Sequence, residues 1–237
     1  MTGAARRIGA VLARRLHEAG ASVAIHYRGS EREAREVAAG LEAERPGSAA
    51  VFRADLARLD EIGKLVEAVV AWSGRLDVLV NNASTFYPTP LGTITGAQWD
   101  DLVGSNLKAP LFLSQAAWPH LRAAGGSIVN IVDIHARRPL RDHSVYGAAK
   151  AGLAMLTRAL AKEMAPQVRV NGIAPGAILW PERGMTESVK RDILEQVPLG
   201  RPGEPDDLAD ALLWLVVRAR YVTGQVIPVD GGRSLGW

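Results

Sequence analysis

Six short apolar runs recur along the whole chain, and helical patterns of one to several turns lie between them. A continuous apolar run such as Ile128 to Val132 is typical of a strand buried on both faces of a parallel sheet. Strands that alternate with helices indicate a mainly parallel sheet with helices on both faces. The sequence therefore predicts an α/β, doubly wound fold of the Rossmann type, with strands at 22–27, 49–55, 76–83, 127–133, 168–176 and 225–230.

Sequence signals for the starts of helices lie between these runs. Apolar spacing predicts the first helix over 6–19. Later starts are marked by two capping boxes and by a proline in a first turn: Ser30-x-x-Glu33, Thr95-x-x-Gln98 and Glu204-Pro205. No internal repeat, low-complexity tract or linker interrupts the pattern, so we expect one Rossmann-type domain over residues 1–237.

One expected strand has no counterpart in the sequence. The chain opens on Met1-Thr2-Gly3, which is a phosphate-loop sequence, and no apolar run comes before it. In a doubly wound sheet the first strand is central, and the phosphate loop follows its carboxyl end. Because a sheet without that strand would leave backbone groups unpaired in the core, we expect a late start of the sequence rather than a lost strand.

Composition excludes several classes of protein. The formal net charge of +3, with no basic block, argues against a nucleic-acid partner. There is no cysteine, so disulfides and thiolate metal sites are ruled out. The apolar run near the C-terminus is far shorter than the roughly 20 residues of a membrane span, and no secretory signal is present. We therefore expect a cytoplasmic protein without a membrane partner.

The stretch from Ile128 to Lys150 holds the candidate chemistry. Its strand ends on Asp133, and Tyr146 follows with Lys150 four positions later. If Tyr146 opens a helix, Lys150 lies one turn along the same face. A lysine ammonium beside a phenol favours the phenolate, so we expect a lowered Tyr146 pKa, as a proton donor opposite a hydride acceptor requires. A plain surface Tyr-Lys pair is the alternative, and for an isolated pair it is the commoner one.

A glycine-containing loop precedes the first helix. In TGAARRIG (2–9), Gly3 and Gly9 let the backbone approach a pyrophosphate, and the helix N-terminus offers free N–H groups to it. Arg7 stands where a central glycine would stand in the usual pattern. Its guanidinium either faces a phosphate or an anionic substrate, or it is a solvated helix residue.

The second nucleotide signal lies after the strand at 22–27. Dinucleotide-binding proteins that prefer NAD carry a carboxylate there, which binds the ribose 2′-hydroxyl. Here Arg28 and Ser30 take that place, and the first carboxylate is Glu31. The residues favour NADPH, with Arg28 and Ser30 on its 2′-phosphate. Asp55-Leu56 after the next strand either meets the adenine edge or caps a helix.

The chain resembles the short-chain dehydrogenase/reductase family over essentially its whole length. The resemblance is carried, in chain order, by TGxxxRxG, NNAS, Asp133/Tyr146/Lys150 and Pro175-Gly176. By this resemblance Tyr146 and Lys150 match the catalytic YxxxK pair, and Asn106 matches the helix asparagine that holds a proton-relay water. The resemblance implies cofactor contacts at Gly3, Arg7, Ile8, Tyr27, Arg28, Ser30, Asp55, Leu56, Asn82, Ala83, Lys150, Pro175 and Gly176.

Two departures from the family pattern point to one branch. Asp133 stands at the family serine, and Arg7 stands at the middle glycine of TGxxxGxG. Both occur in the pteridine reductase branch, whose loop is similar to NNASTFYPTPL (81–91), and 173–182 is similar to its bacterial members. The resemblance implies reduction of dihydropterins, with dihydrofolate as a second substrate. Asp133 would pass a proton through Tyr146 or a water; the alternative is an aspartate that caps the following loop.

The same resemblance implies the substrate contacts. Phe86 would stack on the pterin, with a core aromatic as the alternative, and Trp180 lies in a loop that closes over substrate or is purely structural. The implied set is Arg7, Ser84, Phe86, Asp133, Tyr146 and Trp180. The arginines Arg137, Arg138 and Arg141 either attract an anionic folate tail or lie in a solvated loop.

Three functions stay open at this point. The first is NADPH-dependent pterin reduction by a homotetramer packed through helices around 97–122 and 146–165, as the resemblance implies. The second is a short-chain reductase that acts on a ketone, in which Asp133 is an incidental change. The third is a nucleotide-binding protein without turnover, which the presence of Asn106, Tyr146 and Lys150 argues against.

Overall fold

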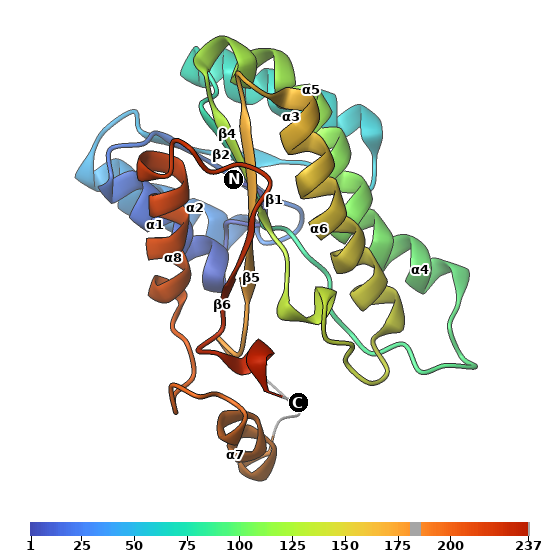
Figure 1. The fold of residues 1–237 in the computed structure, drawn as a ribbon. Helices are drawn as coiled ribbons and strands as arrows, with labels where there is room; N and C mark the ends of the chain where they lie inside the picture. The colour runs from blue at the N-terminus through green and yellow to red at the C-terminus, as the bar shows by residue number, and fades with distance from the viewer. Residues whose placement is uncertain (181–185, 237) are drawn as a thin grey trace.

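A computed structural model describes residues 1–180 and 186–236 of the chain (Figure 1). The strands expected from the sequence are all present in this part, each a little shorter than its apolar run. They all pair in parallel, as buried strands in an α/β protein do. The strands are β1 (Val23–Tyr27), β2 (Ala49–Arg53), β3 (Val78–Asn81), β4 (Ser127–Ile131), β5 (Arg169–Pro175) and β6 (Val226–Val229).

Helices cover both faces of the strands, as expected for this fold class (Figure 1). One apolar core joins α1, α2 and α8 to the strands, and a second core joins α3, α5 and α6 to them. In the described residues no helix is long and apolar enough to cross a membrane. The helices are α1 (Arg7–Glu18), α2 (Glu31–Glu44), α3 (Leu59–Ser73), α4 (Gly96–Val103), α5 (Ala109–Ala124), α6 (Ser144–Met164), α7 (Glu187–Glu195) and α8 (Pro205–Leu213).

Two of the three marked helix starts form as expected. Thr95 and Gln98 make the reciprocal bonds of a capping box at α4, and α8 begins at Pro205 after Glu204. At α2 the capping box is wrong, because Ser30 precedes the helix without a side-chain bond to it. Ser30 lines a cavity instead, which is described below.

The sheet is not continuous, which corrects the expectation of one doubly wound sheet. The strands form a two-stranded sheet, β1-β2, and a four-stranded sheet, β3-β4-β5-β6. Residues 1–4 join the facing edges of β1 and β3 at one end only. The Met1 amino group donates to Ala24 O at 2.8 Å, and the backbone N–H of Thr2 donates to Val80 O at 3.0 Å. A gap therefore separates the rest of β1 from the rest of β3.

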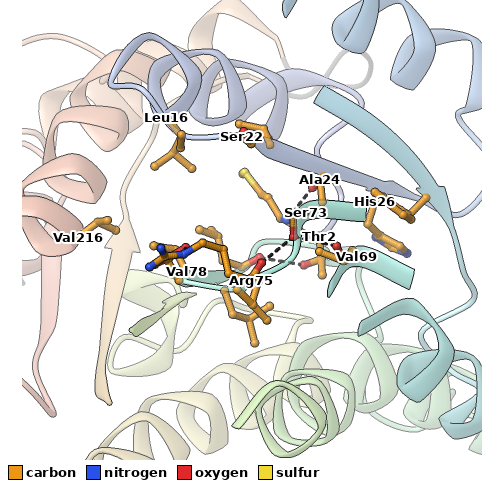
Figure 2. A pocket seen from close by; sticks show the side chains of 18 of the residues that line it. Thr2, Leu16, Ser22, Ala24, His26, Val69, Ser73, Arg75, Val78 and Val216 are labelled. Carbon is orange, nitrogen blue, oxygen red and sulfur yellow. Dashed lines mark hydrogen bonds and ion pairs between the residues drawn. The ribbon is translucent and has the colours of Figure 1, made fainter. Parts of the chain in front are cut away.

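The rest of this gap is a cavity of about 500 Å³, here called the slot (Figure 2). Apolar side chains from both layers line it, among them Leu16, Val69, Val78 and Val216. Alternate backbone groups of β1 and β3 face the slot, because strand residues alternate in direction. Burial at its end lowers the pKa of the Met1 amino group to about 5. The slot is thus bordered by apolar side chains and by the edges of two strands.

Filling the slot is expected to stabilise the protein. We expect a variant with five apolar residues joined to the Met1 amino group, matching the length of β1, to melt roughly 10 °C higher. Each buried aliphatic side chain contributes roughly 1.5–3 kcal/mol and each hydrogen bond about 1 kcal/mol, against about 1–2 kcal/mol for each ordered residue. Differential scanning calorimetry measures the change. A five-residue Gly/Ser extension is the control, and equal Tm values for the two extensions would contradict the expectation.

Candidate active site

Three side chains meet at the carboxyl end of β4. Asp133 lies two residues beyond the strand, and its Oδ1 accepts a hydrogen bond from the His135 backbone N–H at 2.8 Å, which starts a short 3-10 helix. Tyr146 lies in the first turn of α6, and Lys150 lies one turn further along, as predicted. The Tyr146 and Lys150 side chains are buried, with 4% and 3% of their residue surface exposed.

A hydrogen bond joins the two acidic groups. The Tyr146 hydroxyl donates to Asp133 Oδ2 at 2.7 Å. Lys150 Nζ donates to Ile131 O at 2.8 Å and lies 5.7 Å from the centre of the Tyr146 ring. One carboxylate oxygen therefore caps the following loop, and the other accepts from the phenol, whereas the proton relay through Asp133 stays a prediction.

The expected lowering of the Tyr146 pKa is wrong. Burial raises the pKa of the Tyr146 phenol above its usual value, and the Asp133 carboxylate raises it further because a second negative charge beside it is unfavourable. The ammonium of Lys150 is bound to the Ile131 carbonyl, and its position does not offset these effects. Tyr146 is therefore a neutral phenol at working pH, which is the protonated form that a proton donor needs.

The charge of Lys150 is expected to set the alkaline limit of activity. Burial lowers the pKa of Lys150 to about 8, and the Asp133 carboxylate opposes this effect. The ammonium is therefore present below pH 8 and lost above it, so we expect kcat/KM to fall with a midpoint near pH 8. A pH profile of the parent and of Lys150→Arg, which stays charged, tests this. A fall at the same pH in both proteins would exclude Lys150 as its cause.

Phe86 lies beside the Tyr146 phenol, on the loop that follows β3. Its ring stacks on the His143 ring at 4.7 Å with an interplanar angle of 19°, and it meets the Tyr146 ring edge-on at 4.8 Å. Half of the residue, 51%, is exposed, which rules out the core-aromatic alternative. No sequence motif marks the part played by His143, because the contact joins two loops that are distant in the chain.

Asn106 holds the same loop in place. It lies in a π-helix, Gly104–Lys108, a form that is frequent at functional sites. Its Oδ1 accepts from Ser84 Oγ at 2.7 Å, and its Nδ2 donates to Thr85 O at 2.9 Å. Both ends of the buried amide are engaged within the protein. The relay water that the resemblance implies for Asn106 stays a prediction.

A second cavity, of about 660 Å³, lies beyond the ends of β1, β2 and β3. Its size suits a cofactor. Most of the expected cofactor contacts line it: Gly3, Arg7, Ile8, Tyr27, Arg28, Ser30, Asp55, Leu56, Asn82 and Ala83. Ser84 and Phe86 of the implied substrate set also line it.

The remaining expected cofactor contacts do not line this cavity. Lys150 is buried, and its ammonium donates to the backbone carbonyl of Ile131. Pro175 is paired with Val229 in β6, and Gly176 packs against Asp230 so closely that a Cβ would collide with it. The cavity therefore brings together the adenosine and phosphate side of the expected site.

The helix-cap role of Asp55 is wrong, because α3 begins at Leu59 after Arg58, and the adenine contact stays a prediction. The Asp55 side chain lines the cavity, and its Oδ1 also accepts from the Ala57 backbone N–H at 3.1 Å. The carboxylate is thus held at the cavity wall by the turn that it caps.

The N-terminal end of α1 fits a phosphate group. The helix is preceded by Arg6, whose side chain makes no capping hydrogen bond to it. Gly9 packs on the backbone of Gly3 without room for a Cβ. The positive end of this helix, together with the cavity-lining residues Arg7 and Arg28, forms a suitable site for an anion. The residues therefore fit a phosphorylated dinucleotide.

Arg7 has an unusual backbone conformation. Its φ of 53° is in the left-handed region, which residues other than glycine rarely adopt. The side chain lines the cavity, and its Nη2 donates to the backbone O of the half-buried Trp180 at 3.3 Å. Residues 181 and 182 of the motif at 173–182 lie outside the described residues.

The arginine loop is largely solvated. Arg137 and Arg141 are exposed, whereas Arg138 is partly buried and donates to Arg233 O at 3.4 Å. Burial lowers the pKa of Arg233, and the charge of Asp133 opposes this effect, which places the Arg233 guanidinium within the electrostatic range of Asp133. No local motif marks Arg233, because its position depends on where the end of the chain packs.

A family model described as enoyl-(acyl carrier protein) reductase matches residues 3–234. The chain belongs to the short-chain dehydrogenase/reductase family. Pteridine reductase 1 of Leishmania tarentolae is 38% identical over 276 aligned residues, which cover 99% of this chain and 95% of the relative. The 3-oxoacyl-[acyl-carrier-protein] reductase FabG of Staphylococcus epidermidis is 36% identical, with coverage of 98% and 96%.

A third relative is a putative ketoacyl reductase of the granaticin polyketide synthase in Streptomyces violaceoruber, 36% identical with coverage of 99% and 95%. The chain is thus an oxidoreductase of the short-chain dehydrogenase/reductase family, whose members use NAD(P)H. Its similar relatives include proteins named for a pteridine and proteins named for a ketoacyl substrate.

Substitution of Arg7 tests whether its guanidinium binds the substrate. The family pattern has a glycine at this position, so we expect Arg7→Gly to release the left-handed strain, which costs roughly 1–2 kcal/mol, and to keep or raise Tm. Loss of the guanidinium should raise the KM for the substrate by about tenfold, as for one charge-assisted contact. Arg7→Ala is the matched control, and we expect it to show the same rise in KM and a lower Tm than Arg7→Gly. An unchanged KM in Arg7→Gly would remove Arg7 from the binding site.

Proposed function

We propose that this short-chain dehydrogenase/reductase uses NADPH to reduce dihydropterins to tetrahydropterins. The observation that carries the proposal is the 2.7 Å bond from the Tyr146 hydroxyl to Asp133. In a carbonyl reductase a serine hydroxyl at this position donates a hydrogen bond to the substrate oxygen. Reduction of a pterin instead needs a proton at a ring nitrogen, and an acid that is hydrogen-bonded to a carboxylate suits that transfer.

The chain's own residues supply the proton and the orientation. Tyr146 is kept neutral by burial, so its hydroxyl holds a proton at the site. Asp133 accepts from that hydroxyl, and once Tyr146 has given its proton to the substrate, Asp133 can take up a proton from solvent water and pass it to the phenolate. Phe86 offers a half-exposed ring beside Tyr146 on which a planar pterin stacks. NADPH, when bound, supplies the hydride.

The choice of NADPH rests on the second strand. Arg28 and Ser30 line the cofactor cavity directly after β1, where a cofactor site for NADH would place a carboxylate. Arg28 is exposed, which leaves its guanidinium accessible to a 2′-phosphate. These contacts support a preference for the phosphorylated dinucleotide.

The second candidate function is reduction of a ketone on a carrier-bound acyl chain. It is favoured by the FabG and granaticin relatives, whose identity of 36% is close to the 38% of the pteridine reductase. Against it stands the chemistry of Asp133. An ionised carboxylate accepts hydrogen bonds only, so it cannot donate one to a ketone oxygen as a serine does.

One assay separates these functions. NADPH oxidation is followed with dihydrobiopterin, with a β-ketoacyl thioester and without substrate, and each arm is repeated with NADH. We expect turnover with dihydrobiopterin and NADPH that exceeds every other combination. Faster turnover of the thioester would favour the ketoreductase, and turnover with neither substrate would contradict both.

A further inference from the structure

His26 in β1 makes four hydrogen bonds to two other segments, residues 1–4 and the end of β2. Its backbone N–H donates to Met1 O at 3.0 Å, and its backbone O accepts from the N–H of Ala4 at 3.1 Å. Its ring Nδ1 accepts from the Gly3 N–H at 3.2 Å, and its Nε2 lies 3.0 Å from Ala54 O. Only 4% of the residue is exposed. His26 therefore joins the phosphate loop, β1 and the end of β2.

The hydrogen bonds fix the state of the ring. Because a backbone N–H donates to Nδ1, that nitrogen is unprotonated and the proton is on Nε2, which donates to Ala54 O. Burial lowers the pKa of His26 to about 4; the Met1 amino group adds to this effect, whereas the bond to Ala54 and the charge of Asp55 oppose it. The imidazole is therefore neutral at working pH, and both ring contacts persist.

Gly3 is the part of the loop that this ring holds. Gly3 has a φ of 60°, and its Cα lies against Ala83 without room for a Cβ. Its carbonyl accepts from Asn82 Nδ2 at 3.0 Å, whereas its N–H is bound by His26. The peptide units on both sides of the turn are therefore fixed, and the turn leads to the uncapped N-terminus of α1.

The other end of the ring reaches the adenosine side of the site. Ala54 comes directly before Asp55 and Leu56, which line the cofactor cavity. His26 lines this cavity and also lines the slot, so its ring is part of the wall between them (Figure 2). A single imidazole thus spans from the phosphate loop to the adenosine segment.

We propose that His26 is a positioning residue for the dinucleotide, which holds the phosphate loop in register with the segment at Ala54–Leu56. The acceptor at Nδ1 is the part that matters most, because it fixes the Gly3 peptide. The inference rests on the proposed function only in taking a nicotinamide dinucleotide as the ligand.

Two substitutions test the roles of the two ring nitrogens separately. His26→Asn keeps an acceptor near the place of Nδ1, and His26→Gln keeps a donor near the place of Nε2. Dissociation constants for NADPH and for 2′,5′-ADP are measured by fluorescence and calorimetry, together with Tm. We expect the asparagine variant to bind within about threefold of the parent and the glutamine variant to bind at least tenfold more weakly. Both ligands should weaken alike, since both contain the adenosine half.

His17 is the matched control. It is also a buried histidine, with Nε2 at 2.6 Å from Ser48 Oγ, but it does not line the cofactor cavity. His17→Asn should lower Tm and leave the dissociation constants unchanged. Equal losses of affinity in the two His26 variants, in proportion to their losses of Tm, would overturn the proposal. If the parent binds NADH rather than NADPH, the cofactor choice fails, and the same variants test His26 with NADH and 5′-ADP.

Discussion

Replacing Tyr146 by phenylalanine is expected to lower kcat for dihydropterin reduction by about 100-fold or more. The phenol is the protonated group beside Asp133, and burial keeps it neutral. The variant keeps the ring, so its contacts with Phe86 and with Lys150 are retained. The dissociation constant for NADPH should therefore stay nearly unchanged. Steady-state and single-turnover kinetics measure the two effects separately.

Tyr87 provides the matched control for this variant. It lies on the same loop as Phe86 and packs near Tyr146, but its hydroxyl donates to Gln98 O at 3.4 Å. Tyr87→Phe should turn over dihydropterin like the parent. Wild-type kcat in Tyr146→Phe would remove the phenol from the mechanism, and equal losses in both variants would point to a packing effect.

The parts of the fold that depend on local pattern were predictable. The apolar runs gave the strands because a buried parallel strand needs a continuous apolar segment. The helical spacing of Tyr146 and Lys150 placed them one turn apart on α6. The division into two sheets was not predicted, and the slot lies between their facing strands, β1 and β3.

Side-chain direction was not predictable from the same patterns. Thr95 and Ser30 both begin a capping-box sequence, but only Thr95 makes the capping bonds. Ser30 follows a strand end that faces the cofactor cavity, and its side chain lines that cavity instead. The capping-box sequence is present at both helices, and only the path of the preceding chain decides whether the capping bonds form.

Electrostatics at the site required the three-dimensional structure. The spacing of Tyr146 and Lys150 suggested a lowered phenol pKa, but burial and Asp133 raise it. The four-residue spacing does not determine how deeply the phenol is buried or where the Lys150 ammonium points. For the same reason, the stacking of His143 on Phe86 was not found, since it depends on how two distant loops pack.

Replacing Asp133 by serine is expected to exchange one substrate class for another. Serine is the family residue at this position, and its hydroxyl donates to a ketone oxygen but does not return a proton to Tyr146. We expect kcat/KM for dihydrobiopterin to fall by about 100-fold or more, as for loss of a general acid-base group. Binding of NADPH should be retained, because Asp133 does not line the cofactor cavity.

The most direct test of the account is the ratio of kcat/KM for dihydrobiopterin to kcat/KM for a β-ketoacyl thioester, measured in the parent and in Asp133→Ser. Asp133→Asn, which keeps the shape and loses the charge, is measured beside them. We predict a ratio that favours the pterin in the parent and falls by at least about 100-fold in both variants. A parent that prefers the thioester, or an Asp133→Ser variant that reduces dihydrobiopterin as fast as the parent, would contradict it.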